Sequence, residues 1–249
     1  MSDRFWDWGC PWNWSCNSFE KRYADVPQAL TKALKERDGN LFGDDVLNWG
    51  ETHAAYINNV KGLTDIDYDK EEDVEKAYRA GDPVAAFIHA KRLWDNDLEW
   101  SGPKNPLVIF ECLAGMDYPF AYYYVGKAWS DGCYMVADTS KESAMNSSDA
   151  LCYWRKGAAL GDPACYYAMG TMAVAGYEWI IGPDEGIEYF KKAIELGDKR
   201  GYGGIAGIML WNPENYPLDD IVYYSLMAIK EGDTEILDKL IKIYEERRG

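Results

Sequence analysis

Apolar residues in the last two thirds of the chain recur at helical spacing, and each helical stretch is followed by the same short polar signal. The signal is a glycine followed by aspartate, often with a proline after it. Its instances are Gly81-Asp82-Pro83, Gly115-Met116-Asp117-Tyr118-Pro119, Gly161-Asp162-Pro163, Gly197-Asp198 and Gly232-Asp233. The glycines are 34, 46, 36 and 35 residues apart. Three intervals therefore share one period, and the longer one indicates an insertion of about ten residues.

Each residue of this signal suits one position of a tight turn between helices. Glycine accepts the left-handed conformation that ends a helix. Aspartate is a good N-cap for the next helix, and proline fits its first turn. The signal predicts a helix, a turn and a second helix. Its repetition predicts stacked helical hairpins, each too small to bury its apolar face alone.

When the repeats are aligned on this glycine, residues of similar kind stand at the same distance from it in several repeats, and we call each such position a column. Seven residues before the glycine stand Val74, Val108, Trp154 and Phe190, and eight before it stand Tyr153, Tyr189 and Tyr224. Nine after it stand Ala90, Gly170 and Ala206, with Gly126 in phase after allowing two extra residues near Met116. Fifteen after it stand Asn96, Gly176 and Asn212, with Gly132 after the same allowance. We expect the small column to permit close helix packing, because glycine inside a helix costs about 1 kcal/mol relative to alanine. We expect the last column to stop helices in the left-handed conformation.

Two segments, Leu160–Gly176 and Asp184–Gly197, resemble the Sel-one-like repeat family, a relative of the tetratricopeptide repeat. The B helix of that family reads aromatic-basic-basic-Ala-Ala, which Tyr153–Ala159 and Tyr189–Ala193 match. The resemblance is specific in 145–212 and weaker in 73–132 and 218–249. It implies an all-α fold, a right-handed solenoid of about six antiparallel helical hairpins whose A helices line a concave face. It also implies a non-enzymatic scaffold that binds another protein.

The chain departs from regular repeats at both ends and at the insertion. Cys133–Ser148 is expected to be an inserted loop, and Ile236–Arg248 a solubilising C-terminal capping helix. We expect residues 1–72 to form an N-terminal arm and a diverged capping hairpin, and residues 73–249 to form the repeat solenoid. Four tryptophans cluster in the arm, where they either pack over the first hairpin or form an exposed recognition segment. They are Trp6, Trp8, Trp12 and Trp14.

The composition narrows the functional classes. The chain has 42 acidic and 26 basic residues, a net charge of −16, and 47% apolar residues. This mix argues against a disordered chain, and the acidity argues against a nucleic-acid-binding surface. No apolar run approaches the ~20 residues that cross a bilayer, and the N-terminus lacks the core of a secretion signal. We expect a cytoplasmic protein with reduced cysteines, and a negative field that suits a basic partner.

Candidate chemistry is sparse. The two histidines, His53 and His89, lack catalytic neighbours, and His89 is expected to be a packed helix residue. Gly201–Ala206 satisfies a dinucleotide-binding pattern, but its phase places it in an A helix, where that pattern has no meaning. Asp65, Asp67 and Asp69 resemble the start of a calcium loop without its later ligands, so an acidic linker is the preferred interpretation. We predict no catalytic residue, no cofactor and no metal.

These observations predict a protein-binding scaffold that is monomeric when free. The candidate partner-binding residues are Trp100, Tyr123, Tyr167, Trp179, Asp65, Asp67 and Asp69, although each aromatic residue could instead belong to the core between repeats. The preferred function is a bacterial immunity protein that blocks a basic toxin, a role in which Sel-one-like repeats occur. The alternatives are a general signalling or regulatory adaptor and an enzyme with a diverged helical-repeat fold.

Overall fold

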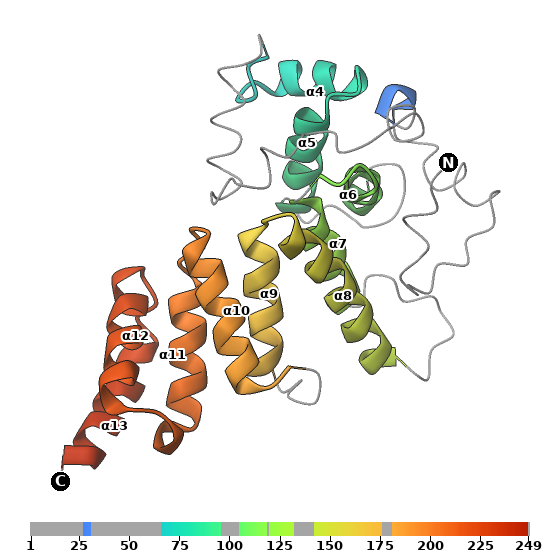
Figure 1. The fold of residues 1–249 in the computed structure, drawn as a ribbon. Helices are drawn as coiled ribbons and strands as arrows, with labels where there is room; N and C mark the ends of the chain where they lie inside the picture. Colours follow the sequence, from blue (N-terminus) through green and yellow to red (C-terminus); the bar gives the residue numbers. More distant parts are fainter. Residues whose placement is uncertain are drawn as a thin grey trace. The chain divides into compact units, whose positions relative to one another are not determined.

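The computed structural model describes residues 27–30, 66–95, 105–118, 120–131, 142–175 and 181–248. Helices joined by turns make up this part of the chain, and it contains no β-strand (Figure 1). The fold is all-α, as the sequence predicts. The α-helices are α4 (Glu71–Arg79), α5 (Pro83–Asp95), α6 (Pro106–Gly115), α7 (Ala121–Ser130), α8 (Glu142–Ala159), α9 (Pro163–Val174), α10 (Pro183–Glu195), α11 (Gly201–Trp211), α12 (Leu218–Lys230) and α13 (Ile236–Arg248). A short 3₁₀ helix, η2, spans Pro213–Asn215.

The described helices form two compact units that divide between residues 160 and 161. In the N-terminal unit, each helix from α4 to α8 packs against the next one along the chain. In the C-terminal unit, α9 packs against α10, and α11 packs against both α10 and α12. Helix α11 also contacts α9 and α13, so helices two apart in sequence are neighbours. This is the contact pattern of stacked helical hairpins.

The turns between hairpins adopt the predicted conformation. Gly81, Gly161, Gly197 and Gly232 have φ of 92°, 87°, 98° and 105°, all in the left-handed region. Two backbone hydrogen bonds close the corners at Gly81, Gly197 and Gly232. At Gly197, its N–H donates to the Ile194 carbonyl at 3.0 Å, and the Asp198 N–H donates to Ala193 at 2.8 Å. The same pair of bonds recurs at Gly81 and Gly232. Glycine avoids the steric cost of a side chain in this conformation.

The second corner lies two residues later than the sequence pattern indicates. Gly115 is the last residue of α6, and the left-handed residue is Asp117, with φ of 54°. Its side chain accepts a hydrogen bond from the Tyr122 hydroxyl at 2.8 Å, and aspartate tolerates this conformation better than most residues. The left-handed residues at 81, 117, 161, 197 and 232 are therefore 36, 44, 36 and 35 apart.

This corrected register changes one residue in the column of large side chains. Phe110, not Val108, lies seven residues before the left-handed position. Phe110 is fully buried, whereas Val108 is only partly buried. Gly126 now falls nine residues after Asp117 without any allowance. The sequence column names Val108 because the pattern places the helix end at Gly115 rather than at Asp117.

The small and large columns pack against each other in two hairpins, α7 with α8 and α9 with α10. A Cβ atom at Gly126 would lie 2.4 Å from Trp154 Nε1, and one at Gly170 would lie 2.7 Å from the Phe190 ring. Real Cβ atoms do not approach other heavy atoms so closely, so only glycine fits these positions. The prediction that small residues permit close helix packing is confirmed at Gly126 and Gly170.

Two local expectations need correction, while the predicted C-terminal helix is present. Helix α8 begins at Glu142, so the last part of the predicted inserted loop is helical. Asn212 ends α11 with φ of −128°, not in the left-handed conformation. Helix α13 spans the residues predicted for the cap, and its exposed face carries charged residues together with Leu237, Ile241 and Tyr244.

The N-terminal predictions lie almost wholly outside the described residues. Only residues 27–30 and 66–72 of the segment 1–72 are described, so the arm, its tryptophans and the capping hairpin stay predictions. No helix in the described part of the chain has the length and apolar character needed to span a membrane.

Candidate functional site

A groove of about 640 Å³ lies in the C-terminal unit, along α9 and α11 and the corners beside them. Helix α9 and the residue after it contribute aromatic, hydroxyl and aliphatic groups. The corner after α10 contributes charged side chains, and α11 contributes backbone. The lining residues are Tyr167, Thr171, Val174, Ala175, Phe190, Gly197, Lys199, Arg200, Gly203, Gly204, Ala228, Glu231 and Asp233. Preformed concave surfaces of this kind bind partners with little loss of conformational entropy.

Glycines in the first turn of α11 create the space. A Cβ atom at Gly204 would lie 2.3 Å from the Phe190 ring, and one at Gly203 would lie 2.7 Å from Asp233 Oδ2. Phe190 is fully buried, and its ring lies against both Gly170 of α9 and Gly204 of α11. Because α11 has no side chain at 203 or 204, its backbone forms part of the groove wall.

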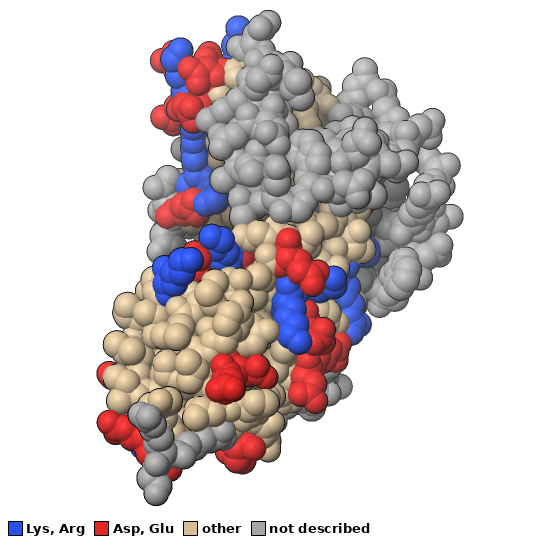
Figure 2. Space-filling model, turned by 60° about the vertical axis from the view of Figure 1, so that its left-hand side comes forward, with Lys and Arg blue, Asp and Glu red and all other residues tan. Residues whose placement is uncertain are grey.

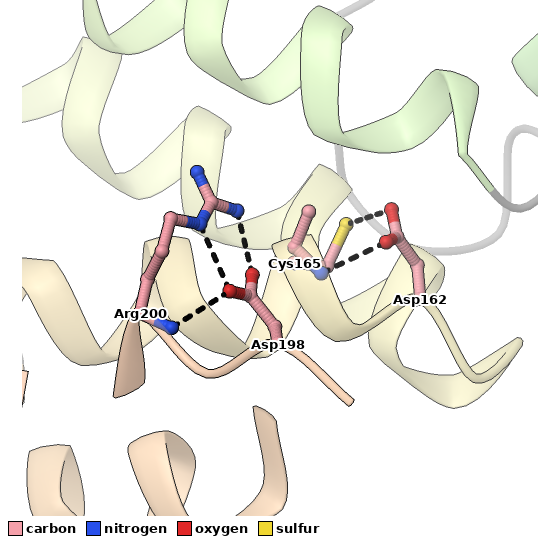
Figure 3. A network of polar contacts seen from close by, with 5 residues as sticks. Asp162, Cys165, Asp198 and Arg200 are labelled. Atoms are coloured by element: carbon pink, nitrogen blue, oxygen red, sulfur yellow. Dashed lines mark hydrogen bonds and ion pairs between the residues drawn. The ribbon is translucent and has the colours of Figure 1, made fainter. Parts of the chain in front are cut away.

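Arg200 lies between a buried carboxylate and the aromatic wall of the groove, and Figure 3 shows its contacts with that carboxylate, Asp198. Its Nε lies 2.9 Å from Asp198 Oδ1 and its Nη2 lies 2.6 Å from Asp198 Oδ2, a two-point ion pair. The Asp198 side chain is nearly buried, so this pair is less screened than a surface one. The guanidinium carbon of Arg200 lies 4.3 Å from the centre of the Tyr167 ring, within cation–π distance. Tyr167 also packs against Phe190, at 5.6 Å between ring centres.

The charges in the groove are of both signs. Lys199 Nζ lies 3.4 Å from Glu231 Oε1, while Arg200 is paired with Asp198. Asp233 adds a further carboxylate. The groove itself is therefore not the purely negative cradle that the composition suggests. The net charge of −16 belongs to the chain as a whole.

A buried carboxyl lies at the preceding corner, one repeat before Asp198. Asp162 is 1% exposed and caps α9 by accepting the Ala164 N–H at 2.9 Å (Figure 3). The Cys165 thiol donates to its other oxygen at 3.1 Å. Burial, with a smaller contribution from the nearby Asp198 charge, raises the pKa of Asp162 to about 7.

This pair has the features of a helix cap rather than a catalytic pair. Burial raises the pKa of the Cys165 thiol well above its usual value, which disfavours the reactive thiolate. Neither Asp162 nor Cys165 lines the groove. A carboxyl with a raised pKa is therefore present, but it is not in a cleft that a substrate could enter.

The sequence-predicted binding residues are in different places. Tyr167 lines the groove. Tyr123 is half-buried in the N-terminal unit, where its carbonyl accepts the Trp154 indole N–H at 3.2 Å and its ring meets Tyr124 edge-on. Asp67 forms an ion pair with Lys70 at 3.1 Å, and Asp69 is exposed beside it. Trp100, Trp179 and Asp65 lie outside the described residues.

Sequence reasoning missed Arg200, Thr171 and the glycines of α11 as groove residues. The available signal was the cluster Gly201-Tyr202-Gly203-Gly204, since several glycines in one helix are costly without a packing reason. Helix α11 contains this whole cluster, so the rejection of a dinucleotide-binding motif there is supported.

The remaining candidate chemistry is structural in the described residues. His89 stacks on Tyr78 at 4.6 Å between ring centres, and its Nδ1 lies 3.4 Å from Glu75 Oε2. Burial lowers the pKa of His89, which keeps the ring neutral near pH 7. No group of three or more potential metal ligands comes together in the part of the chain that the structure describes. His53 lies outside that part.

Comparison with known proteins gives a likeness in structure without one in sequence. No family model matches the chain, and no curated protein sequence matches it. A crystal structure of a Sel1 repeat protein from Oxalobacter formigenes matches with a TM-score of 0.52 and 15% identity, over 92% of this chain and 90% of that chain. At this identity the likeness concerns the fold alone. The chain has the helical-repeat fold of a Sel1 repeat protein, as the resemblance in its sequence implies.

Proposed function

We propose that this chain is a non-enzymatic scaffold that binds another protein, and specifically an immunity-type inhibitor that sequesters a basic toxin. The observation that carries the proposal is the groove along α9 and α11, with Tyr167 held between Arg200 and Phe190. Aromatic residues fixed in a preformed surface dominate protein-binding energy, because little rotamer entropy is lost on binding.

The charge of the chain supports a basic partner. A net charge of −16 attracts a cationic protein at long range and speeds its association, typically by ~10–10³-fold at low salt. The groove then supplies the short-range contacts: an aromatic ring, the Thr171 hydroxyl and the carboxylates of Glu231 and Asp233. Such a division gives fast capture and a specific complex.

The proposal is tested by capturing the partner with the tagged full chain from its native cells, at low and high salt. We expect one stoichiometric basic protein, recovered at low salt and reduced at high salt. Tyr167→Ala removes the aromatic wall and is expected to weaken that complex at least tenfold, the range of a binding hot spot. The matched control is Tyr189→Ala, because Tyr189 lies on α10 outside the groove and bonds Glu185 at 2.7 Å.

Two results would contradict the proposal in different ways. A broad set of partners of mixed charge would indicate a general adaptor. Equal loss of binding in the Tyr167 and Tyr189 variants would mean that the groove is not the binding surface. A toxin-like gene directly upstream of the coding sequence would further favour the immunity role.

A further inference from the structure

Asp233 differs from the aspartates of the other glycine corners in what its carboxylate bonds. At three earlier corners the carboxylate accepts an N–H of the segment that leads into the next helix. These pairs are Asp82 with Ala85 at 2.7 Å, Asp162 with Ala164 at 2.9 Å, and Asp198 with Arg200 at 3.2 Å. The Asp233 carboxylate is exposed and has no hydrogen bond or ion pair within the part of the chain that the structure describes. It is therefore available to a bound molecule.

The Asp233 carboxylate lies in the groove, beside the first turn of α11. A Cβ atom at Gly203 would lie 2.7 Å from its Oδ2, so the carboxylate occupies space that any larger residue at 203 would take. Both Asp233 and Gly203 line the groove. Because Gly203 has no side chain, a flat group can lie on its backbone and still reach the carboxylate.

The two cations of the groove already have carboxylate partners. Lys199 Nζ lies 3.4 Å from Glu231 Oε1, and Arg200 Nη2 lies 2.6 Å from Asp198 Oδ2. Figure 2 shows basic side chains gathered with acidic ones on one face of the molecule, beside a broad uncharged area. Among the charged residues that line the groove, Asp233 is left without a counter-charge. An anionic group would be repelled there, whereas a cationic group supplies the missing charge.

We propose that the groove receives an arginine side chain of the protein partner, whose guanidinium pairs with Asp233 and lies on the backbone of Gly203. The inference rests on the proposed function in one respect, since the arginine belongs to the basic partner proposed above. Guanidinium is planar and presents its donors as a fork that matches both oxygens of a carboxylate. The ammonium of lysine is compact and more strongly hydrated, so it gains less from a flat surface.

The test measures binding of three blocked amino acids to the full chain by amide chemical shifts in NMR. The probes are the N-acetyl, N-methylamide derivatives of arginine, of lysine and of citrulline, which has the shape of arginine without its charge. Salt near physiological strength screens the long-range attraction of the chain. We expect the arginine derivative to bind about fivefold more tightly than the citrulline derivative, the upper range for an exposed ion pair. The largest shifts are expected at the amides of Gly203, Gly204 and Asp233.

Two pairs of variants locate the binding. Asp233→Asn keeps the size of the side chain and is expected to abolish the preference for arginine over citrulline. Its matched control is Asp219→Asn, an exposed carboxylate of α12 outside the groove, which is expected to keep that preference. Gly203→Ala displaces the Asp233 carboxylate, the end of an exposed side chain, and is expected to weaken arginine binding without unfolding the chain. Gly207→Ala, where nothing lies within 4 Å of a new Cβ, is the control for it.

Three results would overturn the proposal: equal binding of the arginine and citrulline derivatives, equal binding of the lysine derivative, or equal effects of the Asp233 and Asp219 variants. Failure here is distinguishable from failure of the proposed function. If Tyr167→Ala weakens the captured complex but Asp233→Asn does not, the partner places no arginine at Asp233 and only this inference is wrong. If the arginine derivative binds at Asp233 but no basic protein is captured, the guanidinium site stands and the proposed partner is wrong.

Discussion

Phe190 is the residue that joins successive hairpins in the C-terminal unit. Its ring is fully buried and lies against glycines of two different helices, Gly170 of α9 and Gly204 of α11. Both helices therefore approach α10 more closely than any larger residue would permit. Interiors packed this tightly transmit small changes in volume directly into the free energy of unfolding.

Gly204→Ala is expected to destabilise the chain even though alanine favours helices. The new Cβ atom would lie 2.3 Å from the Phe190 ring, and overpacking of this kind costs about 1–3 kcal/mol. The matched control is Gly207→Ala on the same helix, where nothing lies within 4 Å of a new Cβ. It is expected to stabilise the chain by up to about 1 kcal/mol. Urea unfolding measures both changes. Equal stability of the two variants would contradict the packing described for Phe190.

Asp162 gives the stability of the chain a specific dependence on pH. Its pKa is about 7 when folded, because of burial, against about 4 when unfolded. The folded state therefore holds a proton that the unfolded state has lost between these two values. The contribution of Asp162 to stability is fully present below pH 4 and is lost as pH rises toward 7.

Asp162→Asn is expected to remove this dependence. Asparagine keeps a side-chain oxygen for the Ala164 N–H but cannot ionise. Unfolding by urea at pH 5, 6, 7 and 8 gives the difference in stability between the unmodified chain and the variant, in which the other titrating groups largely cancel. We expect that difference to shift in favour of the variant by on the order of a few kcal/mol from pH 5 to pH 8. Parallel curves would show that Asp162 titrates normally.

At the scale of helices, the sequence predicts the elements better than their exact phase. The glycine–aspartate signal correctly marks the corners at Gly81, Gly161, Gly197 and Gly232, because few other residues accept a φ near 90°. It fails at Gly115, since the left-handed residue there is Asp117. An aspartate supported by the Tyr122 hydroxyl can replace glycine, and a search for glycines does not see that substitution.

The candidate site was only partly predictable for a similar reason. Tyr167 is recognisable because aromatic residues on A helices are frequent contact residues. The contact of Arg200 with both Asp198 and Tyr167 could not be predicted, because it depends on how the chain turns between hairpins. The surroundings of a residue also cannot be read from its position in the repeat. Asp162 and Asp198 occupy the same position in successive corners, but of the two only Asp198 has an ion-pair partner among the described residues.

For α13, the sequence predicts the helix but not which of its apolar residues are buried. Its helical spacing predicts the bounds of the helix, Ile236–Arg248, which the structure confirms. Periodicity also identifies its apolar residues, but it does not tell which of them have a partner. Only the packing of α13 against α11 and α12 separates the buried apolar residues from the exposed ones.

At the scale of the whole molecule, we propose that the net charge attracts a basic partner and that the groove recognises it. The net charge of −16 is a property of the whole chain. The groove is nearly balanced in charge and offers shape, one fixed aromatic ring and exposed backbone. High salt is therefore expected to slow the association of a basic partner much more than it speeds dissociation, which stopped-flow or surface-based kinetics would measure. A salt effect confined to the dissociation rate would contradict this division.

Hydrogen exchange of the chain with and without its captured partner shows whether the groove along α9 and α11 is the binding surface. The account predicts slower exchange in the segments that line the groove, at 167–175 and 197–204, because bound protein excludes water from a surface that is already formed. We also predict that no other segment gains as much protection. Protection elsewhere, with the groove segments exchanging as in the free chain, would contradict it.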